Sequence, residues 1–110
     1  MRNYRRDKER VTVSLGVIVE SLSETREYRI SDISMGGCYI DSIAPFTEGE
    51  RIVFKFLNTT GNWLKLSGRI VYVFPGSGFG IKFDTLTEDE RNALELIVIS
   101  NGGQPLNKKI

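Results

Sequence analysis

The sequence predicts a mainly β fold, in which six short antiparallel strands form a barrel or a sandwich and one α-helix follows them at the C-terminus. Three observations lead to this fold class. Apolar and polar residues alternate along several short segments, which is the period of half-buried strands. Glycine, proline, asparagine and serine gather between these segments, as they do in tight turns. The period changes to that of a helix once, after Thr87.

The first half of the chain contains three of these segments. We expect strands over residues 11–20, 26–34 and 37–41, with the polar turn Ser-Leu-Ser-Glu-Thr between the first two. The first strand turns alternate residues to one side: Val11, Val13, Leu15, Val17 and Val19. In the third strand Cys38 and Ile40 share a phase, so Cys38 is expected to be a small buried hydrophobic residue.

The second half contains a hairpin and a closing strand. After a loop around Pro45, strands are expected over 50–57 and 63–74, joined by the turn sequence Asn-Thr-Thr-Gly-Asn. Gly68 lies within the longer strand, at a place where a strand of a small barrel would bend. The last strand covers 79–83. Most aromatic residues fall on the inward phase and are assigned to the core: Phe54, Phe56, Trp63, Phe74, Phe79 and Phe83.

The helix has a clear beginning and end. The sequence Thr-Glu-Asp-Glu is a capping box, in which Thr87 is the N-cap and Glu90 reaches back to it. The acidic residues 88–90 suit the helix dipole, which explains them better than a metal ion does. The helix is expected to end at residues 101–102. Its apolar stripe consists of Leu94, Ile97 and Val98.

The 110 residues are long enough for one domain. We expect a flexible basic arm over residues 1–10, the barrel and helix over 11–100, and a loose tail over 101–110. No apolar run approaches the roughly 20 residues of a membrane helix, and the first residues are too polar for a signal peptide. A cytoplasmic location is therefore expected, and a single cysteine fits a reducing compartment.

Composition argues against several function classes. The absence of histidine removes the commonest general base and metal ligand, and no nucleophile stands beside a base, so neither an enzyme nor a metal site is expected. The net charge of +1 is too small for a general nucleic-acid binder. Residues 1–10 carry a net charge of +3 and the remainder −2. A short basic arm on a slightly acidic body indicates a small anionic ligand.

The arm has the residue types of a nucleotide site. Arg5, Arg6 and Arg10 carry planar guanidinium groups that pair with phosphate or with the O6 and N7 edge of guanine. Taken alone, such a run is also typical of a solvated tail.

A second candidate segment spans residues 30–38. Asp32 and Ser34 stand two residues apart and would point the same way on an extended strand. The carboxylate matches the donor edge of guanine, and the hydroxyl can bond to phosphate or base. Gly36 and Gly37 follow, and glycine allows positive φ and close approach to the backbone. The alternative is a turn in which Asp32 and Ser34 accept from local backbone N–H groups.

Together the two segments resemble the PilZ domain family, whose members show R-x-x-x-R ahead of the first strand and D/N-x-S-x-x-G after the second. Residues 6–10 match the first element and residues 32–37 the second. Residues 80–83 resemble the family's closing strand, and the similarity covers roughly residues 4–100. Arg2 and Arg6 also have the R-x-x-x-R spacing, but Arg10 directly precedes the first strand, as the family's second arginine does.

The resemblance implies a barrel and a non-enzymatic receptor for cyclic diguanylate (c-di-GMP), a bacterial second messenger, with no cofactor. Arg6 and Arg10 would hold phosphate and guanine, and the segment that contains Asp32, Ser34, Gly36 and Gly37 would line the other wall. Arg5 occupies a position where an arginine in similar proteins favours a stacked pair of ligand molecules. Ordering of the arm would pass the signal to an unidentified protein or domain. Neither nucleic acid nor a membrane is an expected partner.

Two other functions are consistent with the fold. One is a PilZ-fold interaction scaffold that does not bind the nucleotide, which the complete motifs argue against. The other is a small barrel that binds single-stranded nucleic acid, which would need exposed aromatic residues beside basic ones. The inward phase of the aromatic residues and the near-neutral charge argue against this second alternative.

Overall fold

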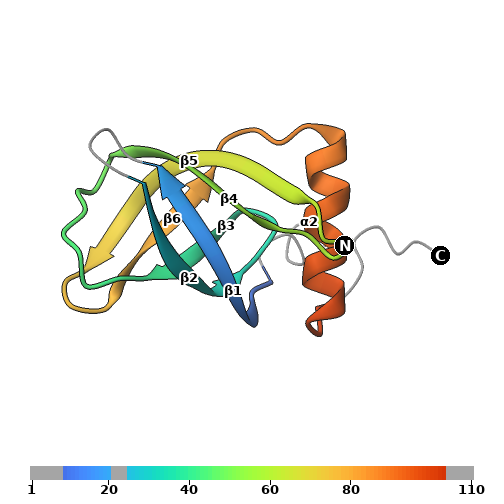
Figure 1. Cartoon of the computed structure of the whole chain (residues 1–110), viewed down its shortest axis with the longest axis horizontal. Coiled ribbons are helices and arrows are strands. Elements are labelled where there is room, and N and C mark those ends of the chain that lie inside the picture. Colours follow the sequence, from blue (N-terminus) through green and yellow to red (C-terminus); the bar gives the residue numbers. More distant parts are fainter. Residues whose placement is uncertain (1–8, 21–24, 104–110) are drawn as a thin grey trace.

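A computed structural model describes residues 9–20 and 25–103. Six antiparallel strands close into a barrel in the order β1–β2–β3–β6–β5–β4, and α2 (Glu88–Ser100) lies at one end of it (Figure 1). The strands are β1 Val11–Glu20, β2 Thr25–Ile33, β3 Gly37–Asp41, β4 Arg51–Leu57, β5 Trp63–Phe74 and β6 Gly78–Phe83. The predicted mainly β barrel with a C-terminal helix is confirmed, and each strand begins and ends within one residue of its predicted bounds.

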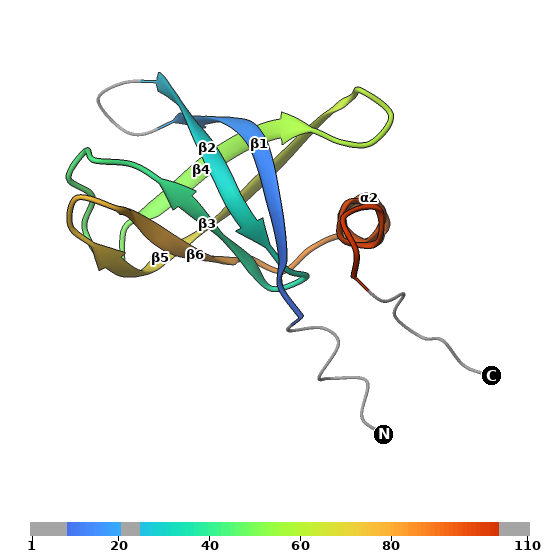
Figure 2. The same ribbon diagram turned by 90° about the horizontal axis from the view of Figure 1, so that it is seen from below.

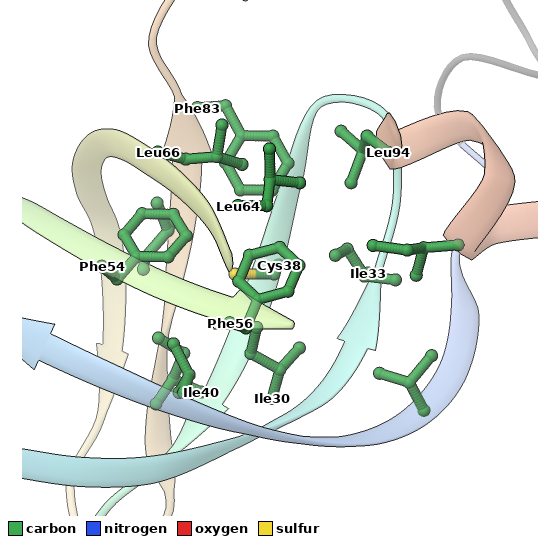
Figure 3. Close-up of a cluster of buried hydrophobic side chains, with 14 of the residues drawn as sticks. Ile30, Ile33, Cys38, Ile40, Phe54, Phe56, Leu64, Leu66, Phe83 and Leu94 are labelled. Carbon is green, nitrogen blue, oxygen red and sulfur yellow. The ribbon is translucent and has the colours of Figure 1, made fainter. Parts of the chain in front are cut away.

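The barrel interior holds a continuous apolar core (Figure 3). The inward positions of β1 are buried as their alternation predicts, apart from the partly buried Leu15. Cys38 and Ile40 are fully buried on the same side of β3. From α2, the predicted stripe of Leu94, Ile97 and Val98 closes the end of the barrel. Burial of this apolar surface is the main source of stability, since each fully buried large side chain contributes about 1.5–3 kcal/mol.

Two of the six aromatic residues assigned to the core are not in it. Phe54, Phe56, Phe79 and Phe83 are buried, but the side chains of Trp63 and Phe74 are 54% and 56% exposed. For Phe74 the reason is a β-bulge.

The bulge lies in β5. Its register against β6 shifts between Ile70 and Tyr72, so Val71 is an extra residue. A one-residue slip moves every later side chain to the other face of the sheet. Val73 then packs against the core, while Tyr72 and Phe74 lie outside. At Gly68, where a bend was expected, the register of β5 does not shift: Gly68 pairs directly with Ile52 of β4 and with Phe83 of β6.

The helix begins and ends as predicted. The Thr87 hydroxyl accepts a hydrogen bond from the Glu90 N–H over 3.1 Å, and the Glu90 carboxylate accepts from the Thr87 N–H over 2.9 Å. Asn101 is the C-cap, and Gly102 follows with φ 103°. Gly103, which we assigned to the loose tail, is buried and donates to the carbonyl of Val98; residues 104–110 lie outside the described part of the chain. No described helix is long and apolar enough to cross a bilayer.

Candidate functional site

The turn between β2 and β3 is built around Ser34. Because β2 ends at Ile33, Ser34 is not on the strand, and its side chain does not project beside Asp32 as an extended chain would require. The buried Ser34 hydroxyl accepts hydrogen bonds from the N–H groups of Gly36 and Gly37, both over 3.2 Å, and lies 3.3 Å from the Gly37 carbonyl oxygen. Ser34 therefore holds the turn in shape, which is the alternative that the sequence left open for this segment.

The two glycines of this turn have different surroundings. Neither has positive φ, so this turn does not use the left-handed conformation that glycine allows. A Cβ at Gly37 would lie 2.0 Å from the carbonyl oxygen of Ile81 in β6, whereas a Cβ at Gly36 would meet nothing closer than the Ser34 hydroxyl at 4.0 Å. Gly37 thus allows β3 and β6 to approach each other, and Gly36 is open to the outside.

Asp32 lies on the outside of the barrel because β2 contains a bulge. The register of β2 against β3 shifts between Ile30 and Asp32, which makes Ser31 an extra residue. Both Ile30 and Ile33 can then be buried, and the Asp32 carboxylate points outward with about a third of its side chain exposed.

The Asp32 carboxylate binds Arg10. The Nε and Nη2 atoms of Arg10 lie 2.7 and 2.6 Å from Oδ1 of Asp32. This pair connects the second arginine of R-x-x-x-R with the first residue of D-x-S-x-x-G, so the two motifs meet on one face of the barrel. Arg5 and Arg6 lie outside the described residues.

A concavity of about 270 Å³ lies beside this pair. Four of the predicted site residues line it: Arg10, Ser34, Gly36 and Gly37. Sequence reasoning missed its other wall, where Lys82 supplies a cation opposite Gly37 and where Val71 and Tyr72 supply an apolar surface. Lys82 could have been found from its outward phase in the closing strand. Val71 also lies on the outward phase of its strand. Tyr72 could not have been found, because alternation places it inward and only the bulge turns it outward.

Tyr72 is held in place by its neighbours. Its ring lies over Gly80, where a Cβ would come within 2.3 Å of it, and stacks on Tyr39 with a centroid distance of 6.2 Å. Phe74 contacts the same ring at 5.2 Å. The wall of the concavity therefore presents a fixed aromatic surface, suited to a planar ring such as a purine.

The thiol of Cys38 lies beneath the concavity and is fully buried. Burial raises the pKa of the Cys38 thiol, while Arg10 lowers it and Asp32 raises it by smaller amounts. This residue therefore stays a protonated thiol. Among the described residues, no group of three potential ligands is placed to hold a metal ion.

Fold and concavity together define a small β-barrel domain with a surface site that combines two cations, a carboxylate and an aromatic wall. Residues 4–100 match the family model described as "PilZ domain", so the chain belongs to the PilZ domain family. No curated protein matches the sequence.

Solved structures share the fold. The PilZ domain of CeSA from a cellulose-synthesizing bacterium has a TM-score of 0.66 and 20% identity, covering 84% of this chain and 97% of that one. The PilZ domain of YcgR from Escherichia coli, solved with c-di-GMP, has a TM-score of 0.73 and 13% identity over 84% of this chain and 88% of that one. PlzA of Borreliella burgdorferi, in complex with c-di-GMP, has a TM-score of 0.62 and 17% identity, covering 78% of this chain and 38% of that one.

Proposed function

We propose that this protein is a non-enzymatic, cytoplasmic receptor for c-di-GMP, which binds between the N-terminal R-x-x-x-R arm and the turn after β2. The observation that supports it best is the Arg10–Asp32 pair at the rim of the concavity. It brings together two motifs that are 22 residues apart in the sequence. Membership of the PilZ family and the c-di-GMP complexes of two similar structures support the same ligand.

The chemistry of the concavity fits a guanine nucleotide. Arg10 and Lys82 supply positive charge for phosphate, and Arg10 retains donors on Nη1 beyond those it gives to Asp32. The Asp32 carboxylate can accept from the N1–H and N2–H groups of guanine. Val71 and Tyr72 offer an apolar surface to a base.

The size of the concavity supports a role for the arm. About 270 Å³ is slightly below the roughly 300–1,000 Å³ typical of ligand sites. A dinucleotide would project from it, and Arg5 and Arg6 would then cover the exposed part. Binding would order the arm across the barrel and change the surface offered to a downstream protein or domain.

Calorimetric titration with c-di-GMP tests the proposal. The Arg6→Ala and Arg10→Ala proteins should lose binding while keeping the melting temperature of the wild type. Arg29→Ala is the matched control, because Arg29 forms an ion pair of the same kind with Asp41 away from the site. Unchanged affinity in both site variants would refute the proposed site. A wild-type protein that binds no c-di-GMP would instead favour the scaffold function.

A further inference from the structure

The outer face of the β4–β5 hairpin carries a second set of cations. Figure 2 shows the turn of this hairpin extending past the neighbouring strands on the side of α2. From the turn inward, residues directly opposite each other on this face form four pairs: Leu57 with Trp63, Lys55 with Lys65, Val53 with Ser67, and Arg51 with Arg69. We call these eight residues the hairpin face.

Two of the four pairs place like charges directly opposite each other. Lys55 faces Lys65 and Arg51 faces Arg69, and Lys82 of β6 extends the second row beyond Arg69. Such pairs destabilise a sheet. Asp84 is bound to Arg51 at 2.5 Å and also acts on Arg69 through its charge, while Glu90 borders the same hollow as Lys65. None of the ion pairs in the described part of the chain includes Lys55 or Lys65, and an anionic partner would relieve the repulsion between them.

The end of the hairpin face is apolar and exposed. The side chains of Leu57 and Trp63 are 48% and 54% exposed, and the Lys55 ammonium lies 4.9 Å from the centre of the Trp63 ring. Beside them is a shallow hollow of about 270 Å³, bordered by Gly16 and Ile18 of β1 and by Glu27 of β2. Tryptophan next to lysine is the combination that lies at the boundary between water and lipid, since both have an apolar body and a polar end.

We propose that the hairpin face docks on an anionic phospholipid surface. Trp63 and Leu57 enter the headgroup region, and the two lysines and Arg69 contact lipid phosphates. The sequence predicted no membrane partner because it contains no apolar run long enough to span a membrane. Peripheral docking of this kind does not need such a segment.

The observations favour lipid over two other anionic partners. An acidic protein would have to place one carboxylate opposite each cation, whereas lipids move laterally and impose no register. A single-stranded nucleic acid would stack bases on free aromatic faces, but Lys55 already lies over the ring of Trp63.

The test uses the full chain with vesicles of phosphatidylglycerol or of phosphatidylcholine. Trp63 is the only tryptophan, so its emission reports directly on the hairpin face. The emission should shift to shorter wavelength, and the protein should float with the vesicles, only with phosphatidylglycerol. The Lys55→Gln/Lys65→Gln protein should partition at least about tenfold less, since each cation near an anionic surface contributes about fivefold. Trp63→Ala, followed by flotation alone, should weaken binding by about fivefold or more.

The matched control is Arg29→Gln/Arg91→Gln, which removes two exposed cations from β2 and α2. It should bind like the wild type, and melting temperatures establish that all variants fold. Equal partitioning of the lysine and control variants would overturn the proposal, as would equal binding to phosphatidylcholine. Binding of polyglutamate or a thymidine oligonucleotide without any binding to phosphatidylglycerol would overturn it in favour of a protein or nucleic-acid partner.

Discussion

The α-carbon of Gly37 faces the carbonyl oxygen of Ile81 so closely that an added Cβ would lie 2.0 Å from it. The last glycine of the D-x-S-x-x-G motif is therefore required by the pairing of β3 with β6, whether or not a ligand is present. The motif combines residues that shape the turn, Ser34 and Gly37, with residues that face outward, Asp32 and Gly36.

Substitution of the two glycines should separate these roles. Gly37→Ala should lower the free energy of unfolding by about 1–3 kcal/mol or more, because the backbone of β6 must move to admit the methyl group. Gly36→Ala has open space and should change it by less than about 0.5 kcal/mol. Urea denaturation of both variants measures the difference. Equal stability of the two proteins would contradict the role assigned to Gly37.

Ser34→Ala should destabilise the turn after β2. The substitution removes the acceptor for the N–H groups of Gly36 and Gly37 in a buried setting, at a cost of about 1–2 kcal/mol. Thermal unfolding measures the loss, with Ser31→Ala in β2 as the control. A Ser34→Ala protein of wild-type stability that had nevertheless lost c-di-GMP binding would assign the hydroxyl to the ligand instead.

Asp32→Ala should weaken c-di-GMP binding by about tenfold or more, because charged hydrogen bonds contribute about 1.5–3 kcal/mol. Asp32→Asn keeps an oxygen that can accept from Arg10, so its loss should be smaller. Stability should change by less than about 1 kcal/mol in both, since the ion pair is exposed. Calorimetry compares them with Asp41→Ala, which breaks the corresponding pair with Arg29 and should bind normally.

Asp84 should make stability depend on pH in the acid range. Hydrogen bonds from the Ser67 hydroxyl and from Arg51 lower the pKa of Asp84 below its ordinary value. A lowered pKa in the folded state means that the stabilisation is complete above about pH 4, the pKa of an unfolded aspartate. It disappears as the pH falls through the folded-state pKa.

The Asp84→Asn protein should therefore lose stability relative to the wild type at neutral pH, and the difference should shrink on acidification. Melting temperatures at a series of pH values provide the measurement. A constant difference across the series would mean that the Asp84 charge is not involved.

Local patterns predicted most of the fold, and the motifs predicted four of the ten residues that line the concavity. Strand phases placed the core residues of β1, β3 and β4 correctly, and the capping box at Thr87 placed the start of α2. The sequence motifs identified Arg10 and Asp32, which the structure pairs. The strands and the start of the helix depend on residues a few positions apart, whose period and hydrogen-bonding capacity are readable from the chain itself. Arg10 and Asp32 were identified instead by the resemblance of their motifs to those of the PilZ family.

The sequence by itself determined the number of strands, their approximate bounds along the chain, and the two motifs. Only the tertiary structure decided that β3 pairs with β6 and β1 with β4, which places Lys82 opposite Gly37. It also decided the bulge at Val71, which turns Tyr72 and Phe74 outward and makes the aromatic wall. Strand partners and bulges arise when a whole sheet closes on itself, so they depend on residues that are distant in sequence, and alternation within one strand does not contain them.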